Sequence, residues 1–100
     1  MITGTYDVVL HTPLGVKKGE LVLTQVVNDL IGRIIVLGSD NEIENGTAEG
    51  NDFSFSGELK TAMGKQAFTC KGNVQYDTLT GEVVTRKAKM KLSGMRKEEQ

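Results

Sequence analysis

The residues of this chain that could do chemistry are few, and they lie far apart in its 100 positions. His11 is the only histidine, and a catalytic base needs a nucleophile and an orienting group beside it. It falls out of phase with Val8 and Leu10, so we expect it on the outer face of a strand. Cys70 is the only cysteine, which excludes an internal disulfide. Because Cys70 shares a strand phase with Phe68, we predict a buried and unreactive thiol.

Paired carboxylates are the next candidate, because such pairs serve acid–base catalysis or hold calcium. Glu42 and Glu44 lie two residues apart and therefore share a strand face. Ile43 between them marks the inward face, so we predict that both carboxylates are solvated. No further ligand types gather around them, and we expect neither a catalytic residue, a metal site nor a cofactor. The segment 45–47 matches the glycosylation pattern, but we interpret it as a turn.

A basic run occupies the last predicted strand and its approach: Arg86, Lys87, Lys89 and Lys91. Such a run can follow the phosphates of a nucleic acid. Its face carries no aromatic side chains for base stacking, and the formal net charge of the chain is −1. Pairing with Glu82 and Asp7 on neighbouring strands accounts for the run, so we predict no nucleic-acid partner.

Composition places the chain among ordinary globular domains. Hydrophobic residues make up 38% and charged residues 25%, and 12 glycines against one proline suit many tight turns. No apolar run approaches the roughly 20 residues that span a bilayer, so we expect no membrane partner. The N-terminus shows no basic stretch followed by an apolar run, which predicts a cytoplasmic protein.

The elements that must position these residues are strands, because apolar and polar residues alternate through most of the chain. The strands that we predict are Tyr6–His11, Leu21–Thr24, Leu30–Leu37, Glu42–Glu44, Phe53–Lys60, Phe68–Cys70, Leu79–Val83 and Met90–Leu92. The predicted breaks are Thr12–Gly15, Asn28–Asp29, Ser39–Asn41 and Ala62–Gly64.

A shift of 49 residues aligns the chain with itself. It pairs Leu10 with Leu59, Thr12 with Thr61, Gly15 with Gly64, Leu30 with Leu79, and Gly32 with Gly81. A fixed offset of this kind indicates a repeated architecture, with four strands in each half. We therefore predict one all-β domain over 1–96, with halves of about 1–49 and 50–96, and a frayed charged tail at 97–100. Eight antiparallel strands close into an up-and-down barrel without exposed edges; a two-sheet sandwich is the alternative.

Gly4-Thr5-Tyr6 near the start and Arg96 near the end resemble the calycin superfamily, which includes lipocalins and fatty-acid-binding proteins. In lipocalins a Gly-x-Trp on the first strand packs under an arginine from near the end of the barrel. The resemblance implies that Tyr6 and Arg96 close one mouth, with tyrosine replacing the tryptophan. The Thr-Pro-Leu-Gly and Thr-Ala-Met-Gly turns resemble those of small bacterial calycin-like barrels of uncharacterised role.

The inward positions of such a barrel are almost wholly apolar. The predicted lining includes Tyr6, Val8, Leu21, Ile34, Phe55, Phe68, Cys70, Val83 and Met90. Gly32, Gly57 and Gly81 lie in the same series and remove bulk. Either the side chains fill the interior, or the missing bulk leaves a small apolar cavity. The second interpretation predicts a non-catalytic barrel that binds a small hydrophobic molecule.

Apolar residues also occur at outward positions of the first three strands: Val9, Val22, Ile31, Ile35 and Leu37. Together they could form a patch larger than a monomer usually exposes. A symmetric homo-oligomer packing wall on wall would bury it. The alternative function is therefore a structural or assembly module that acts through its outer wall.

Overall fold

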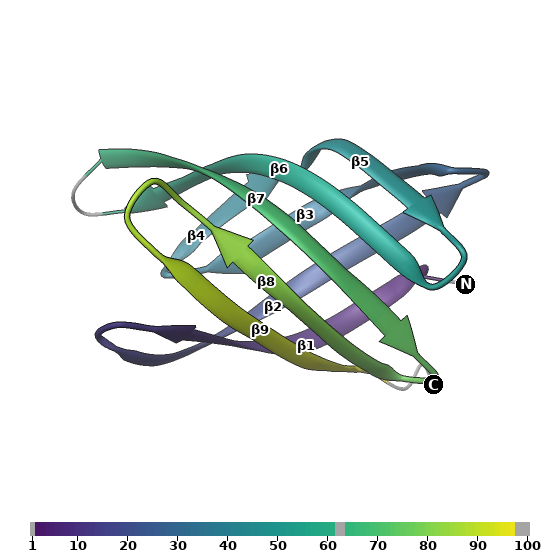
Figure 1. Ribbon diagram of the computed structural model, residues 1–100, viewed down its shortest axis with the longest axis horizontal. Helices are drawn as coiled ribbons and strands as arrows, with labels where there is room; N and C mark the ends of the chain where they lie inside the picture. Colours follow the sequence, from purple (N-terminus) through teal and green to yellow (C-terminus); the bar gives the residue numbers. More distant parts are fainter. Residues whose placement is uncertain (1, 62–63, 98–100) are drawn as a thin grey trace.

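The computed structural model describes residues 2–61 and 64–97. Within these residues it contains nine strands and no helix (Figure 1). The strands are β1 (Gly4–Thr12), β2 (Gly15–Val26), β3 (Asp29–Val36), β4 (Ser39–Glu42), β5 (Glu44–Glu49), β6 (Asp52–Thr61), β7 (Gly64–Gln75), β8 (Thr78–Val84) and β9 (Lys89–Arg96). No helix among the described residues is therefore long and apolar enough to cross a membrane.

The strands form one closed antiparallel barrel. Their order is β2-β1-β9-β8-β7-β6-β5-β3, and the pairing of β2 with β3 closes the ring. Strands β4 and β5 both pair with β3 and are two parts of one barrel strand interrupted at Ile43. The predicted eight-stranded up-and-down barrel is thus confirmed, and the sandwich alternative is wrong because one sheet closes on itself.

Alternation along each strand produces the core. In β1, Tyr6, Val8 and Leu10 are buried, whereas Asp7 and His11 between them are exposed. The core comprises Ile2, Tyr6, Val8, Leu10, Leu21, Leu23, Leu30, Ile34, Val36, Ala48, Phe53, Phe55, Leu59, Phe68, Cys70, Val74, Leu79, Val83, Met90 and Leu92.

Two of the predicted breaks are wrong. The second turn is Val27-Asn28, one residue earlier than predicted, with Val27 at a φ of 58°. Segment 39–41 is not a break, because Ser39–Glu42 pairs with β3 after a turn at 37–38. Ser39, Asp40 and Asn41 are of residue types that are common in turns, but here they belong to strand β4. The predicted turn residues Ala62 and Met63 lie outside the described residues.

Strand bounds in the two halves differ by the same offset of 49 that aligns the sequence. Strands β2 and β7 cover positions 15–26 and 64–75, β1 and β6 end at 12 and 61, and β3 and β8 begin at 29 and 78. Positive φ angles recur at the same offset, at Gly15 and Gly64 and at Val27 and Tyr76. The duplication itself stays an interpretation of the sequence.

The barrel has two different ends. At the tip end lie the connections β1–β2, β3–β4, β6–β7 and β8–β9, on the left of Figure 1. At the terminal end lie the turns β2–β3, β5–β6 and β7–β8, the start of β1 and the end of β9. Lys97, which we assigned to the frayed tail, is held at the terminal end, because its N–H donates to the Thr5 carbonyl over 2.7 Å.

Candidate functional site

The residues predicted to line a ligand cavity come together in the barrel interior, where they pack on one another. Eight of the nine are at most 3% exposed and Met90 is 8% exposed. The Phe53 and Phe55 rings stack at 5.9 Å, and Phe68 meets Phe55 edge-on at 6.1 Å. The predicted lining is therefore part of the packed hydrophobic core of the barrel.

The interior glycines mark close approaches of neighbouring groups. A Cβ on Gly57 would lie 3.0 Å from the Phe68 ring, and one on Gly32 would strike the Val22 carbonyl. At Gly81 it would lie 2.9 Å from the Lys71 carbonyl oxygen. The space left by the missing side chains is thus occupied by rings and backbone, as in a close-packed core.

Cys70 belongs to this core and has no exposed surface. Burial raises the pKa of its thiol to about 12, because the thiolate would lose its hydration. The reactive thiolate form of Cys70 is therefore suppressed at neutral pH.

The terminal end is where Tyr6 and Arg96 meet. The Arg96 guanidinium carbon lies 5.3 Å from the Tyr6 ring centroid, and Nη2 donates to the Tyr6 hydroxyl over 2.8 Å. That hydroxyl donates in turn to the Ile2 carbonyl over 2.6 Å. Arg96 Nη1 also contacts Asp77 at 3.1 Å. The hydrogen bond with Tyr6 raises the pKa of Arg96 further above its usual range.

Gly4 makes this arrangement possible. Its φ is 156°, and a Cβ there would lie 2.9 Å from Arg96 Nε and 3.1 Å from Cδ. Glycine therefore leaves room for the arginine stem to pass over the first strand on its way to Tyr6. The Gly-x-Tyr spacing has a direct steric reason.

The outer-wall residues predicted as an oligomer interface lie on the first three strands but are separated by polar side chains. Val9 stands between Lys18 and Ser93, and Val22 between Thr5 and Arg33 in the strand register. Ile35 stands between Glu20 and Asp40. Ile31 faces Thr24 and is 58% exposed. Leu37 lies in the turn after β3, with a φ of 56°. Val22 lies diagonally across from Ile31 and Ile35, which are two residues on either side of its direct partner Arg33, whereas Val9 is set apart from them by Lys18 and Ser93.

The remaining candidate residues are not brought together. His11 is exposed and stands between Val16 and Lys91 in the register. Glu42 and Glu44 are both exposed, on either side of the interruption at Ile43. Within 2–61 and 64–97, no three side chains of metal-binding types form a group.

Cations gather at the tip end, which the sequence reasoning did not foresee. Of the 12 lysines and arginines, eight lie there: Lys17, Lys18, Lys60, Lys65, Arg86, Lys87, Lys89 and Lys91. Carboxylates at this end are Asp40, Glu42, Glu58 and Glu82. Asp40 pairs with Arg33 at 2.7 Å, and Glu82 stands directly opposite Lys91 in the strand register. Lys60 and Lys65 flank the second copy of the repeated turn, and Lys17 and Lys18 follow the first copy closely; these positions were the available signal.

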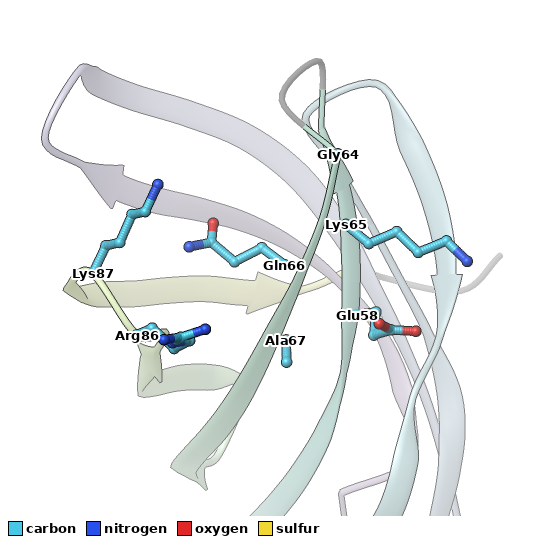
Figure 2. A pocket seen from close by; sticks show the side chains of 7 residues that line it. All are labelled: Glu58, Gly64, Lys65, Gln66, Ala67, Arg86 and Lys87. Carbon is cyan, nitrogen blue, oxygen red and sulfur yellow. The ribbon is translucent and has the colours of Figure 1, made fainter.

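A hollow of about 630 Å³ lies within this basic region, beside the projecting β6–β7 hairpin. It is lined by Glu58, Gly64, Lys65, Gln66, Ala67, Arg86 and Lys87. Figure 2 shows Lys87 and Gln66 reaching toward one another from the β8–β9 loop and from β7. The Thr85 hydroxyl fixes that loop by accepting the N–H groups of Lys87 and Ala88 over 3.2 and 3.1 Å.

The described lining of the basic hollow consists mainly of groups that bind anions. Ammonium, guanidinium and amide groups recognise carboxylates and phosphates. Glu58 is the only carboxylate of the lining, and no histidine or cysteine borders it.

No family model, no curated protein and no solved structure matches the chain. A function for this chain must therefore be inferred from its geometry.

Proposed function

We propose that this chain is a non-catalytic assembly module that binds further copies of itself through its outer surface. The observation that carries the proposal is the contrast between the two kinds of surface. The interior side chains are buried against one another, whereas Leu14, Val27 and Tyr76 are between 83% and 95% exposed. Exposed apolar groups that lie together mark interaction surfaces, and Val27 and Tyr76 lie on turns at the same end of the barrel.

We also propose kinship with the calycin superfamily. Support comes from the closed eight-stranded meander and from the guanidinium over the Tyr6 ring at the terminal end. A reducing, cytoplasmic location is part of the same proposal, and the single buried cysteine supports it.

Self-association is tested by sedimentation velocity over a concentration range. The proposal predicts that the weight-average mass rises with concentration between about 10 µM and 1 mM, as mass action requires. Ile35→Lys tests the outer wall separately. Lysine would stand between Glu20 and Asp40, so the fold should stay intact. A smaller species for Ile35→Lys would assign the association to the wall, and a wild type that is monomeric throughout would contradict self-association.

The calycin-like pairing of Tyr6 with Arg96 favours a second candidate, the binding of a small apolar molecule inside the barrel. Ligand entry would require core side chains to separate, beginning with Met90, the most exposed of them. Native mass spectrometry of freshly purified protein tests this candidate, because it would show a bound ligand as added mass. Protein free of added mass, together with no binding of hydrophobic fluorescent probes, would exclude it.

A further inference from the structure

The most exposed apolar side chains of the chain lie at its two ends. At the tip end, Leu14 is 90% exposed in the β1–β2 turn and Val16 beside it is 58% exposed. At the terminal end, Val27 is 83% exposed in the β2–β3 turn and Tyr76 is 95% exposed in the β7–β8 turn. Each end of the barrel therefore presents apolar groups on short turns.

Two of these groups are held in an unfavourable backbone conformation. Val27 and Tyr76 have φ angles of 58° and 57°, in the left-handed region that suits glycine and asparagine. A β-branched residue there is an outlier that costs stability. The two positions are related by the 49-residue offset, and neither side chain is buried by its own fold. The two-residue hairpins between Val26 and Asp29 and between Gln75 and Thr78 require this backbone conformation, but they do not require an exposed apolar side chain. The apolar side chains at these positions are therefore available for a contact outside the fold.

The β1–β2 turn presents Leu14 in a fixed position. The Thr12 hydroxyl donates to the Gly15 carbonyl over 2.6 Å and accepts the Leu14 N–H over 3.2 Å. The hairpin also projects beyond the barrel, because β2 pairs with β3 only from Gly19 onward. A rigid apolar tip loses little conformational entropy when it binds.

The charges of the two ends are opposite. The tip end carries the eight cations named above, and Lys60 stands directly opposite Lys65 in the β6–β7 hairpin. Like charges in that position repel each other, so a counter-charge would stabilise them. The terminal end carries four exposed carboxylates: Asp29, Glu49, Asp52 and Asp77. Its two cations are engaged within the molecule, Arg96 with Asp77 and Lys97 with Glu20 and Asp7.

We propose that copies of this chain associate head to tail, with the basic tip end of one copy seated on the acidic terminal end of the next. The partner is a second copy because complementary charge and exposed apolar turns are both present on the same chain. The basic hollow of Figure 2 would receive carboxylates of the neighbouring copy. Each copy then contacts one neighbour through its tip end and another through its terminal end. Such a contact builds linear chains, or rings where the rotation between copies closes. This inference rests on the proposed function and specifies its geometry.

Charge reversal at each end tests the geometry. The tip variant is Lys65→Glu with Lys87→Glu, and the terminal variant is Asp29→Lys with Glu49→Lys; all four side chains are exposed. We expect each variant alone to associate at least about tenfold more weakly than the wild type by sedimentation velocity at low salt, where exposed charges are least screened. An equimolar mixture should regain association, because the acidic tip of the first variant complements the basic terminal end of the second, and the two natural ends complement each other. The control, Glu44→Lys on the middle of the wall, should associate like the wild type.

Several outcomes would overturn the head-to-tail geometry. One is undiminished association of both end variants, and another is a mixture that stays as weakly associated as its components. If Ile35→Lys abolishes association while the end variants retain it, self-assembly stands and the end-to-end contact does not. Binding of the monomer to phosphatidylserine vesicles without any self-association would show that the basic end serves a lipid surface instead.

Tyr76→Asn supplies a test whose two readouts move in opposite directions. Asparagine tolerates the left-handed conformation, so the melting temperature should rise. Loss of the exposed ring should weaken association by several-fold if Tyr76 lies in the contact. Unchanged association of a correctly folded Tyr76→Asn would remove the terminal turn from the interface.

Discussion

At the scale of single residues, Tyr6 links three parts of the chain. Its hydroxyl donates to the Ile2 carbonyl and accepts from Arg96, so it ties the N-terminal segment to the end of β9. The ring is fully buried. The sequence placed Tyr6 and Arg96 at one mouth by resemblance, whereas the Ile2 contact had no signal, because Ile2 precedes the alternating pattern.

Replacing Tyr6 by phenylalanine should therefore destabilise the fold. Tyr6→Phe leaves the Ile2 carbonyl and one Arg96 donor without this partner, which costs about 1–3 kcal/mol for buried groups. Tyr76→Phe removes the same hydroxyl from a ring that is 95% exposed and should change stability by less than about 0.5 kcal/mol. Urea unfolding of both variants measures the difference, and equal effects would contradict a structural role for the Tyr6 hydroxyl.

Cys70 should give stability a specific dependence on alkaline pH. Burial raises its pKa to about 12 from an ordinary value of 9.0, so between these pH values the folded chain holds a proton that the unfolded chain has lost. The free energy of unfolding then falls with rising pH, by up to about 1.4 kcal/mol per unit from this group. Its contribution is fully present below pH 9.

Comparison with Cys70→Ala isolates that contribution from other titrating groups. The stability advantage of the wild type over Cys70→Ala should be larger at about pH 8 than at about pH 10.5. Urea unfolding at both pH values measures it. A constant difference would show that the thiol ionises as easily in the folded chain as in the unfolded one.

At the scale of elements, the alternation of apolar and polar residues predicted the buried strand positions, whereas residue types typical of turns did not predict all of the turns. Phe53, Phe55 and Leu59 follow the two-residue period, and all are buried. The turns at Val27 and Leu37 carry apolar residues at positive φ, which no sequence rule for turns would select. Ser39–Glu42 has the composition of a turn but is paired by its neighbours in β3. Tertiary pairing overrides local preference there.

The β2–β3 turn offers a stability test at this scale. Val27→Asn should raise the free energy of unfolding by about 0.5–1 kcal/mol, because asparagine accepts a φ of 58° better than a β-branched residue does. Val26→Asn, at a half-exposed strand position, is the control and should give no gain. Thermal unfolding compares them, and an equal response of both would mean that backbone strain at Val27 is negligible.

At the scale of the whole molecule, folding determines which side chains are buried in the barrel and how the charged side chains are distributed over its surface. The sequence predicted the barrel and most of its core but left open whether the interior was filled. Only the positions of neighbouring strands could decide that, since Gly32 and Gly57 are closed off by groups from other strands. The formal net charge of −1 also predicted nearly equal numbers of positive and negative side chains. Folding separates the charges, because it brings lysines and an arginine from three distant segments, 17–18, 60–65 and 86–91, to one end.

The measurement that bears most directly on assembly through the ends is the mixing of the two charge-reversed variants in the analytical ultracentrifuge. End-to-end contact predicts weak association of each variant alone and a larger average mass in the equimolar mixture, with the gain lost at about 0.5 M salt as screening shortens the reach of the charges. A mixture whose average mass equals that of its separate components at every concentration would contradict it.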